Sequence, residues 1–100
     1  MTRNARIFVG TGTFLLGFDE LVTAADAAAK ALDLDGFAQI GHSRVEPARL
    51  RYERFVPVDE MRRAMAESDV VVCHGGVGML GEAMRAKKPI IAVARRGSTT

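Results

Sequence analysis

The sequence has few of the residues that mark several common classes of protein. It contains no tryptophan, one tyrosine and a single cysteine, Cys73, among 100 residues. One cysteine cannot form an internal disulfide, and so few stacking side chains argue against a nucleic acid as the partner. The chain also has no 18-residue apolar run and no charged-then-apolar leader, so neither a membrane span nor secretion is expected. We therefore expect one domain over residues 1–100, with a cytoplasmic location by default.

The charge of the chain is small overall but unevenly distributed. The formal net charge is +2, yet residues 85–100 carry 5 of the 14 basic side chains and none of the 12 acidic ones. Cations are favoured at the C-terminal ends of helices, so a solvated helix end with an unpaired tail explains this basic stretch. An anionic ligand, an acidic membrane surface or a partner protein is the alternative explanation.

Residues 69–94 have the pattern of a strand, a glycine-rich turn, a helix and a second strand. Val70 to Cys73 form a continuous apolar run, which is typical of an interior strand covered on both faces of a parallel sheet. The glycines after His74 give the backbone the freedom for a sharp turn. The helix that begins near Val77 directs its free N–H groups and its positive dipole end towards that turn, where an anion is favoured.

The alternation of strand and helix patterns along the chain predicts its fold class. We expect strands at 6–10, 37–41, 52–56, 69–73 and 89–94, and helices over 19–34, 58–68 and from about 77, with Asp19 as the cap of the first helix. This order predicts an α/β, Rossmann-like domain with a parallel five-stranded sheet, ordered 3-2-1-4-5, and helices on both faces. Ligands of such sheets bind at the carboxyl ends of the strands, where both glycine-rich loops are placed.

The glycine turn fits more than one kind of nucleotide. Taken literally, the spacing of Gly76, Gly78 and Gly81 matches the dinucleotide fingerprint, placed after a strand and at the start of a helix. A Rossmann domain normally carries this fingerprint on its first strand, however, whereas here it follows the fourth. No acid lies about 20 residues further on; instead Arg95 and Arg96 end the next strand, and arginines at such a place can accommodate the 2′-phosphate of NADP. An NADP-binding module is therefore one alternative.

A longer pattern favours a nucleotide sugar. Residues 69–89 read Asp-Val-Val-Val-Cys-His-Gly-Gly-x-Gly-x-x-x-Glu-Ala-x-x-x-x-Lys-Pro, which resembles the C-terminal domain of family 28 GT-B glycosyltransferases. The opening Ile7-Phe-Val-Gly-Thr-Gly-Thr13, followed by Phe18-Asp19, and the middle Phe55-Val-Pro-Val-Asp-Glu-Met61 are similar as well, so the resemblance extends from about Ile7 to Arg96. Short chains of this kind are the soluble donor-binding subunits of two-part enzymes, such as the dolichol-linked UDP-GlcNAc transferase and the bacterial exopolysaccharide β-glycosyltransferases.

The resemblance implies a binding site for a UDP-sugar. The diphosphate is expected between the loop 10–13 and the turn 74–78, the uracil against the backbone at 55–56, and the ribose hydroxyls on the carboxylate of Glu82. The family commonly has Thr or Ser where this chain has Met79, so backbone N–H groups are expected to carry that phosphate contact alone. The implied site residues are Gly10, Thr11, Gly12, Thr13, Phe55, Val56, His74, Gly75, Gly76, Gly78, Met79 and Glu82.

Purely structural roles stay open for three of the polar side chains. Glu82 lies early in its helix, where a carboxylate complements the positive end of the dipole. His74 ends a strand, where backbone groups can satisfy the ring, although the resemblance implies a contact with phosphate or sugar. His42 falls in a polar loop that lacks periodicity and is expected at the surface.

The resemblance also implies a role for the whole chain. We expect a donor-binding subunit of an inverting glycosyltransferase that transfers a sugar to a lipid-linked acceptor without a metal or another cofactor. The catalytic base and the acceptor site are expected on a membrane-associated partner, through which the chain reaches the membrane. Family members continue past the last strand with an acidic-Gln segment and a helix, whereas this chain stops at Thr100. A natural short form, a truncated chain and a non-catalytic interaction subunit that has lost donor binding all fit this departure.

Overall fold

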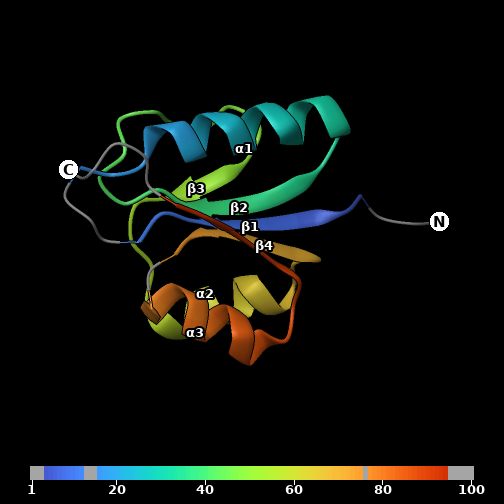
Figure 1. Ribbon diagram of the computed structural model, residues 1–100. Helices are drawn as coiled ribbons and strands as arrows, with labels where there is room; N and C mark the ends of the chain where they lie inside the picture. The colour runs from blue at the N-terminus through green and yellow to red at the C-terminus, as the bar shows by residue number, and fades with distance from the viewer. Residues whose placement is uncertain (1–3, 13–15, 76, 95–100) are drawn as a thin grey trace.

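The protein forms one five-stranded sheet with helices on both faces, as described by a computed structural model over residues 4–12, 16–75 and 77–94 (Figure 1). The sheet is ordered β3-β2-β1-β4-β5, and all neighbouring strands are parallel. The predicted α/β class and the strand order 3-2-1-4-5 are therefore confirmed. The elements in chain order are β1 (Arg6–Gly10), α1 (Asp19–Leu32), β2 (Asp35–Gln39), β3 (Arg51–Glu53), α2 (Val58–Ala66), β4 (Val70–His74), α3 (Val77–Ala86) and β5 (Ile90–Val93).

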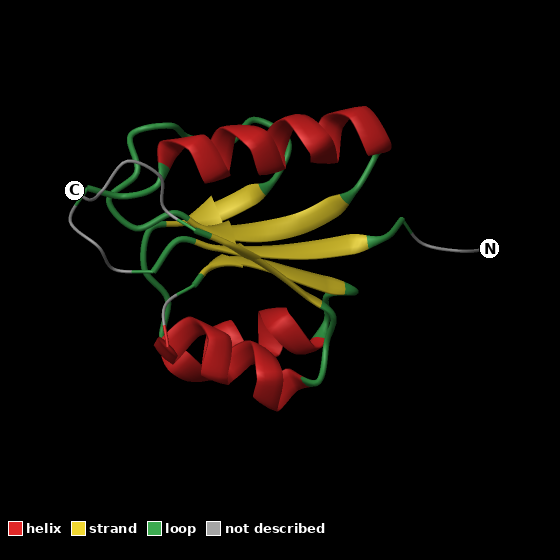
Figure 2. Ribbon diagram, viewed as in Figure 1, coloured by secondary structure: helices red, strands yellow, loops and turns green. Residues whose placement is uncertain are grey.

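Two apolar cores lie on opposite faces of the sheet. Figure 2 shows α1 on one face and α2 with α3 on the other. Side chains of a strand alternate between faces, so Ile7 and Val9 of β1 pack on the α1 side while Phe8 packs against the other helices. Residue Cys73 is fully buried in this second core, and burial raises the pKa of its thiol. Among the described residues, no helix is long and apolar enough to cross a membrane.

Strand β4 lies inside the sheet, as its unbroken apolar sequence predicts. It pairs with β1 on one side and with β5 on the other. In the first of these pairs Gly10 lies opposite Cys73, so β1 and β4 end at nearly the same level. The loops that follow these two strands therefore leave the sheet side by side.

The start of α1 differs from the prediction. Phe18, and not Asp19, occupies the N-cap position, and the helix begins at Asp19 without a side-chain cap. The Asp19 carboxylate instead accepts hydrogen bonds from the N–H groups of Arg44 and Val45, at 2.6 and 3.1 Å. The prediction was wrong because a loop from a distant part of the chain supplies better-placed donors than the helix does.

The predicted boundaries also shift at several other elements. Strand β3 ends at Glu53, three residues before the predicted end, although the carbonyl of Arg54 still accepts from the N–H of Gly41 at 2.8 Å. The guanidinium of Arg54 donates to the carbonyls of Gly41 and Ser43. Helix α1 ends at Leu32 because the next residue, Asp33, adopts a left-handed conformation with φ 55°. Strand β2 therefore begins at residue 35, two residues before the predicted start, and α2 ends at residue 66, two residues before its predicted end.

One carboxylate on α1 fixes the loop that joins β2 to β3. Asp26 accepts three backbone hydrogen bonds, from the N–H groups of Ala48, Arg49 and Leu50, at 2.9, 2.9 and 3.0 Å. Desolvation acts to raise the pKa of this carboxyl, but the three N–H groups and Lys30 outweigh it and hold the pKa below its usual value. A loop, and not a helix, joins β2 to β3. The three hydrogen bonds to Asp26 hold this loop against α1.

We expect Asp26→Ala to lower the free energy of unfolding by about 2 kcal/mol, because three N–H groups lose a charged acceptor. A depressed native pKa stabilises the fold above the pKa of the unfolded chain, and this contribution is lost as pH falls through the native pKa. The difference in unfolding free energy between the protein and Asp26→Asn should therefore be constant near pH 7 and shrink on acidification. Urea titrations at several pH values measure it, with Glu20→Gln on the same helix as the control. A difference that does not depend on pH would contradict this account.

Candidate functional site

The carboxyl ends of β1 and β4 bring together two of the loops expected to bind a ligand. Gly12 has φ 79°, in the left-handed region that favours glycine. A Cβ atom placed on Gly12 would lie 3.2 Å from Nε2 of His74, so the first loop lies directly against the histidine that ends β4. The sequence prediction that these two segments share one edge of the sheet agrees with this contact.

A buried amide holds the first loop in place. The side chain of Gln39 is almost fully buried; its Oε1 accepts from the N–H of Gly12 at 2.9 Å, and its Nε2 donates to the carbonyl of the same residue at 3.1 Å. Nε2 also donates to the carbonyl of Arg54 at 2.7 Å, just after β3. Gln39 therefore joins the ends of three strands. The sequence analysis missed it, although a lone polar residue in the apolar run 37–41 was a signal.

The neighbouring threonine faces the sheet. Thr11 is buried, and both its N–H and its hydroxyl donate to the carbonyl of Gln39, at 3.0 and 3.2 Å. Its side chain and its backbone N–H therefore both belong to the support of the loop. Thr13 and Gly76, two further expected site residues, lie outside the described residues.

At the turn from β4 into α3, the side chain of Met79 covers Gly10, whereas Gly75 and Gly78 are open. A Cβ on Gly10 would lie 2.8 Å from both Sδ and Cε of Met79, so this side chain covers the end of β1. Around Gly75 and Gly78, in contrast, an added Cβ would meet no atom of the described residues within 4 Å. The first turn of α3 contains no acidic side chain. The start of this helix therefore has room for an anion and no nearby carboxylate on its own first turn to repel one.

Glu82 has a partner that the sequence did not reveal. Glu82 lies in the second turn of α3. The favourable interaction of a carboxylate with the positive end of the helix dipole is confined to the first turn, so it does not explain this residue. Its carboxylate accepts two hydrogen bonds from Arg62 of α2, at 2.8 and 3.1 Å, and Arg85 lies 3.9 Å away. The hydrogen bonds from Arg62 hold the pKa of Glu82 below its usual value, so the carboxylate is charged at neutral pH. The Glu82 side chain is 17% exposed.

The segment after β3 presents an aromatic side chain at the same edge. Phe55 is half exposed, and its ring meets the edge of His42 with a centroid distance of 5.1 Å and an interplanar angle of 67°. His42 is exposed, as predicted for a surface loop. Val56 is half-buried. Phe55 and Val56 are separated from β1 by β2, and Gln39 provides the hydrogen-bonded connection between the two regions.

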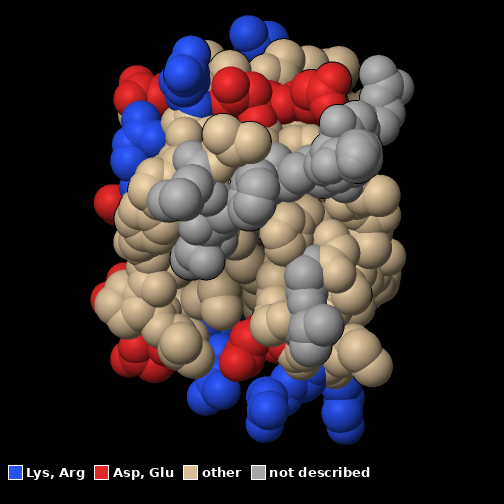
Figure 3. Space-filling model, turned by 60° about the vertical axis from the view of Figure 1, so that its left-hand side comes forward, with Lys and Arg blue, Asp and Glu red and all other residues tan. Residues whose placement is uncertain are grey.

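Among the described residues, few charged side chains lie on the surface over the strand ends. Figure 3 brings this side of the molecule forward and shows Lys, Arg, Asp and Glu gathered above and below a band of other residues. In the described part of the chain, no group of three His, Cys, Asp or Glu residues is placed to hold a metal ion.

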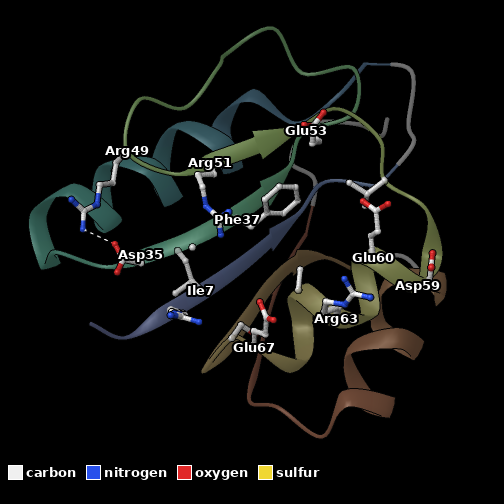
Figure 4. A pocket seen from close by; sticks show the side chains of 15 residues that line it. Ile7, Asp35, Phe37, Arg49, Arg51, Glu53, Asp59, Glu60, Arg63 and Glu67 are labelled. Carbon is white, nitrogen blue, oxygen red and sulfur yellow. Dashed lines mark hydrogen bonds and ion pairs between the residues drawn. The ribbon is translucent and has the colours of Figure 1, made fainter. Parts of the chain in front are cut away.

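A groove of about 720 Å³ lies elsewhere, between α2 and the β2-β3 side of the sheet (Figure 4). Basic and acidic side chains line it together, including Arg51 and Glu67, and the ion pair of Arg49 with Asp35 closes one end. Of the described site residues predicted from the sequence, only Val56 contributes to its wall. We therefore place the candidate site at the carboxyl ends of the strands and not in this groove.

Comparisons with known proteins agree with the sequence resemblance. The profile of the "Glycosyltransferase family 28 C-terminal domain" matches residues 6–99. Among solved structures, the glycosyltransferase SnogD from Streptomyces nogalater superposes with a TM-score of 0.68 at 20% identity, over 100% of this chain and 28% of SnogD. The glycotransferase of kitacinnamycin gives a TM-score of 0.72 at 22% identity, over 94% of this chain and 26% of that protein. No curated protein sequence matches. The chain thus spans little more than a quarter of either structural relative.

Proposed function

The chain belongs to the glycosyltransferase family 28 C-terminal domain family, and from this premise we propose that it binds the UDP-sugar donor of a glycosyltransferase. The observation that carries the proposal is the meeting of two loops at one edge of the sheet. Gly12 lies against His74, and the open positions at Gly75 and Gly78 lead directly into the start of α3. Room beside a helix N-terminus is what a diphosphate requires.

Each part of the donor has a candidate contact. The N–H groups at the start of α3 receive the diphosphate beside the loop at Gly12, whose own N–H is held by Gln39, so that no metal is required to offset the charge of the diphosphate. The backbone at Phe55 and Val56 receives the uracil, with the ring of His42 beside it. The carboxylate of Glu82 accepts hydrogen bonds from the ribose hydroxyls. None of these residues is assigned as the catalytic base, which we place on the acceptor half of the enzyme.

Titration of the purified chain tests donor binding. We expect UDP and at least one of UDP-GlcNAc, UDP-Gal and UDP-Glc to give saturable heats in isothermal calorimetry, while NADPH gives none. Binding of NADPH without UDP would support the dinucleotide alternative. The absence of any nucleotide binding would support the role of an interaction subunit that has lost its donor site.

We further propose that the complete transferase includes an acceptor domain on a membrane-associated partner, with a lipid-linked acceptor and inversion at the transferred sugar. A transfer reaction needs the acceptor oriented against the donor and water excluded from both, and one loop-lined edge of a single sheet provides only the donor side. The basic stretch from Arg85 to Arg96 is suited to lie near that partner or the anionic lipid surface.

Co-expression with an acceptor-domain protein from the same source tests this arrangement. We expect a stable complex on size-exclusion chromatography and sugar transfer that neither chain shows alone. Sugar transfer by the purified chain without a partner would contradict the two-part arrangement but would leave the donor site intact.

A further inference from the structure

The buried amide of Gln39 connects two segments that lie on opposite sides of β2. Gln39 is 4% exposed; its Nε2 donates to the carbonyl of Gly12 at 3.1 Å and to that of Arg54 at 2.7 Å, and its Oε1 accepts from the N–H of Gly12. Gly12 belongs to the loop after β1, and Arg54 directly precedes Phe55 after β3. Both hydrogens of the amide are therefore used, one towards each of the two segments.

A second connection joins the same two segments at the other end of the first loop. The guanidinium of Arg54 donates to the carbonyl of Ser43 at 2.7 Å, and the hydroxyl of Ser43 accepts from the N–H of Phe18 at 2.8 Å. Phe18 comes directly before α1, so the connection between β1 and α1 is tied near both of its ends to Arg54. The position of the segment that starts at Phe55 therefore depends on the position of that loop.

The segments around Gln39 are packed too closely for a further side chain to lie between them. Gly41 has φ 55°, and a Cβ placed on it would lie 2.5 Å from the carbonyl oxygen of Gly12 and 3.3 Å from Nε2 of Gln39. The N–H of Gly41 also donates to the carbonyl of Arg54, at 2.8 Å. Contact with Gly41 opposes movement of the loop towards the end of β2, and the hydrogen bonds of Gln39 oppose movement away from it. The spacing between Gly12 and Arg54 is therefore fixed in both directions.

We propose that Gln39 is a positioning residue that sets the spacing between the uracil and diphosphate contacts, and that it thereby favours ligands which carry both groups. This inference rests on the proposed function. A ligand that spans two contacts gains affinity from the second one only when both are held at the matching separation. A free nucleoside or a free pyrophosphate uses one contact, so its affinity does not depend on that separation.

The experiment compares UDP with its two parts, uridine and pyrophosphate, on the full chain. Calorimetry gives the affinity for UDP, and NMR chemical-shift titrations give the weaker affinities for the parts. Gln39→Met removes all three hydrogen bonds of the amide at a similar side-chain length. We expect it to lower UDP affinity by about 10-fold or more and to change the affinities for uridine and pyrophosphate by less than about 2-fold. Gln39→Asn keeps an amide on a side chain too short to reach both segments, so it should give the same pattern, and either variant suffices for the comparison.

The matched control is Ser68→Ala, which removes a buried hydrogen bond of 2.7 Å near the amino end of β4, away from the site. It should keep the wild-type affinity for all three ligands, and thermal unfolding should show that the variants are folded. Equal losses for UDP, uridine and pyrophosphate in the Gln39 variants would mean that Gln39 only maintains the fold, and wild-type UDP affinity in them would also overturn the inference. A wild-type protein that binds no UDP would overturn the proposed function itself, and the inference with it.

Discussion

Glu82→Gln should weaken UDP-sugar binding by about 10- to 150-fold, because a carboxylate that accepts two ribose hydroxyls contributes charge-assisted hydrogen bonds that an amide cannot fully replace. The substitution keeps the size of the side chain and one acceptor oxygen. It also turns the ion pair with Arg62 into a single weaker contact. Calorimetric titration of UDP and of the preferred UDP-sugar measures the loss.

The ion pair with Arg62 offers a purely structural explanation of Glu82, and the two explanations predict different results. An exposed arginine and a glutamate that only link α2 to α3 would change stability slightly and leave nucleotide affinity untouched. Glu67→Gln, an exposed acid just after α2, is the control for the loss of one negative charge. If both variants bind UDP with wild-type affinity, Glu82 is a structural residue and the ribose contact must lie elsewhere.

The fold could be predicted from the sequence because its signals are local. The unbroken apolar run from Val70 to Cys73 indicated an interior strand, and β4 has a paired strand on each side. The alternation of strands and helices then limited the topology, since parallel strands need crossovers of one hand. These two features limit the possible strand orders, and the Rossmann-like class, in which the order 3-2-1-4-5 is common, supplies the one that is found.

The contacts that define the site were missed for the opposite reason. Gln39 is separated from Gly12 by 27 residues, and Arg62 is separated from Glu82 by 20. No periodicity links such pairs, because their approach depends on how separate elements pack. The wrong assignment of Asp19 as a cap has the same origin, since its donors come from a loop 25 and 26 residues further on.

A substitution at the start of α3 should change UDP affinity and the stability of the domain in opposite directions. Gly78→Ala should weaken UDP binding by about 10- to 100-fold while raising the stability of the domain by up to about 1 kcal/mol. In the part of the chain that the structure describes, an added Cβ meets no atom within 4 Å at this position, so no described neighbour has to move. Helical Cα–Cβ bonds tilt towards the N-terminus, and the new methyl group therefore enters the space in front of the N–H groups where the diphosphate is placed.

Gly81→Ala is the matched control for this prediction, because Gly81 lies in the same helix and an added Cβ there also meets no atom of residues 4–12, 16–75 and 77–94 within 4 Å. It is three residues further from the turn, so it should raise stability by a similar amount and leave nucleotide affinity unchanged. Chemical denaturation and UDP titration of both variants give the two quantities independently. A Gly78→Ala protein that gains stability and still binds UDP as tightly as Gly81→Ala would mean that the diphosphate does not occupy the start of α3, even if the chain binds UDP.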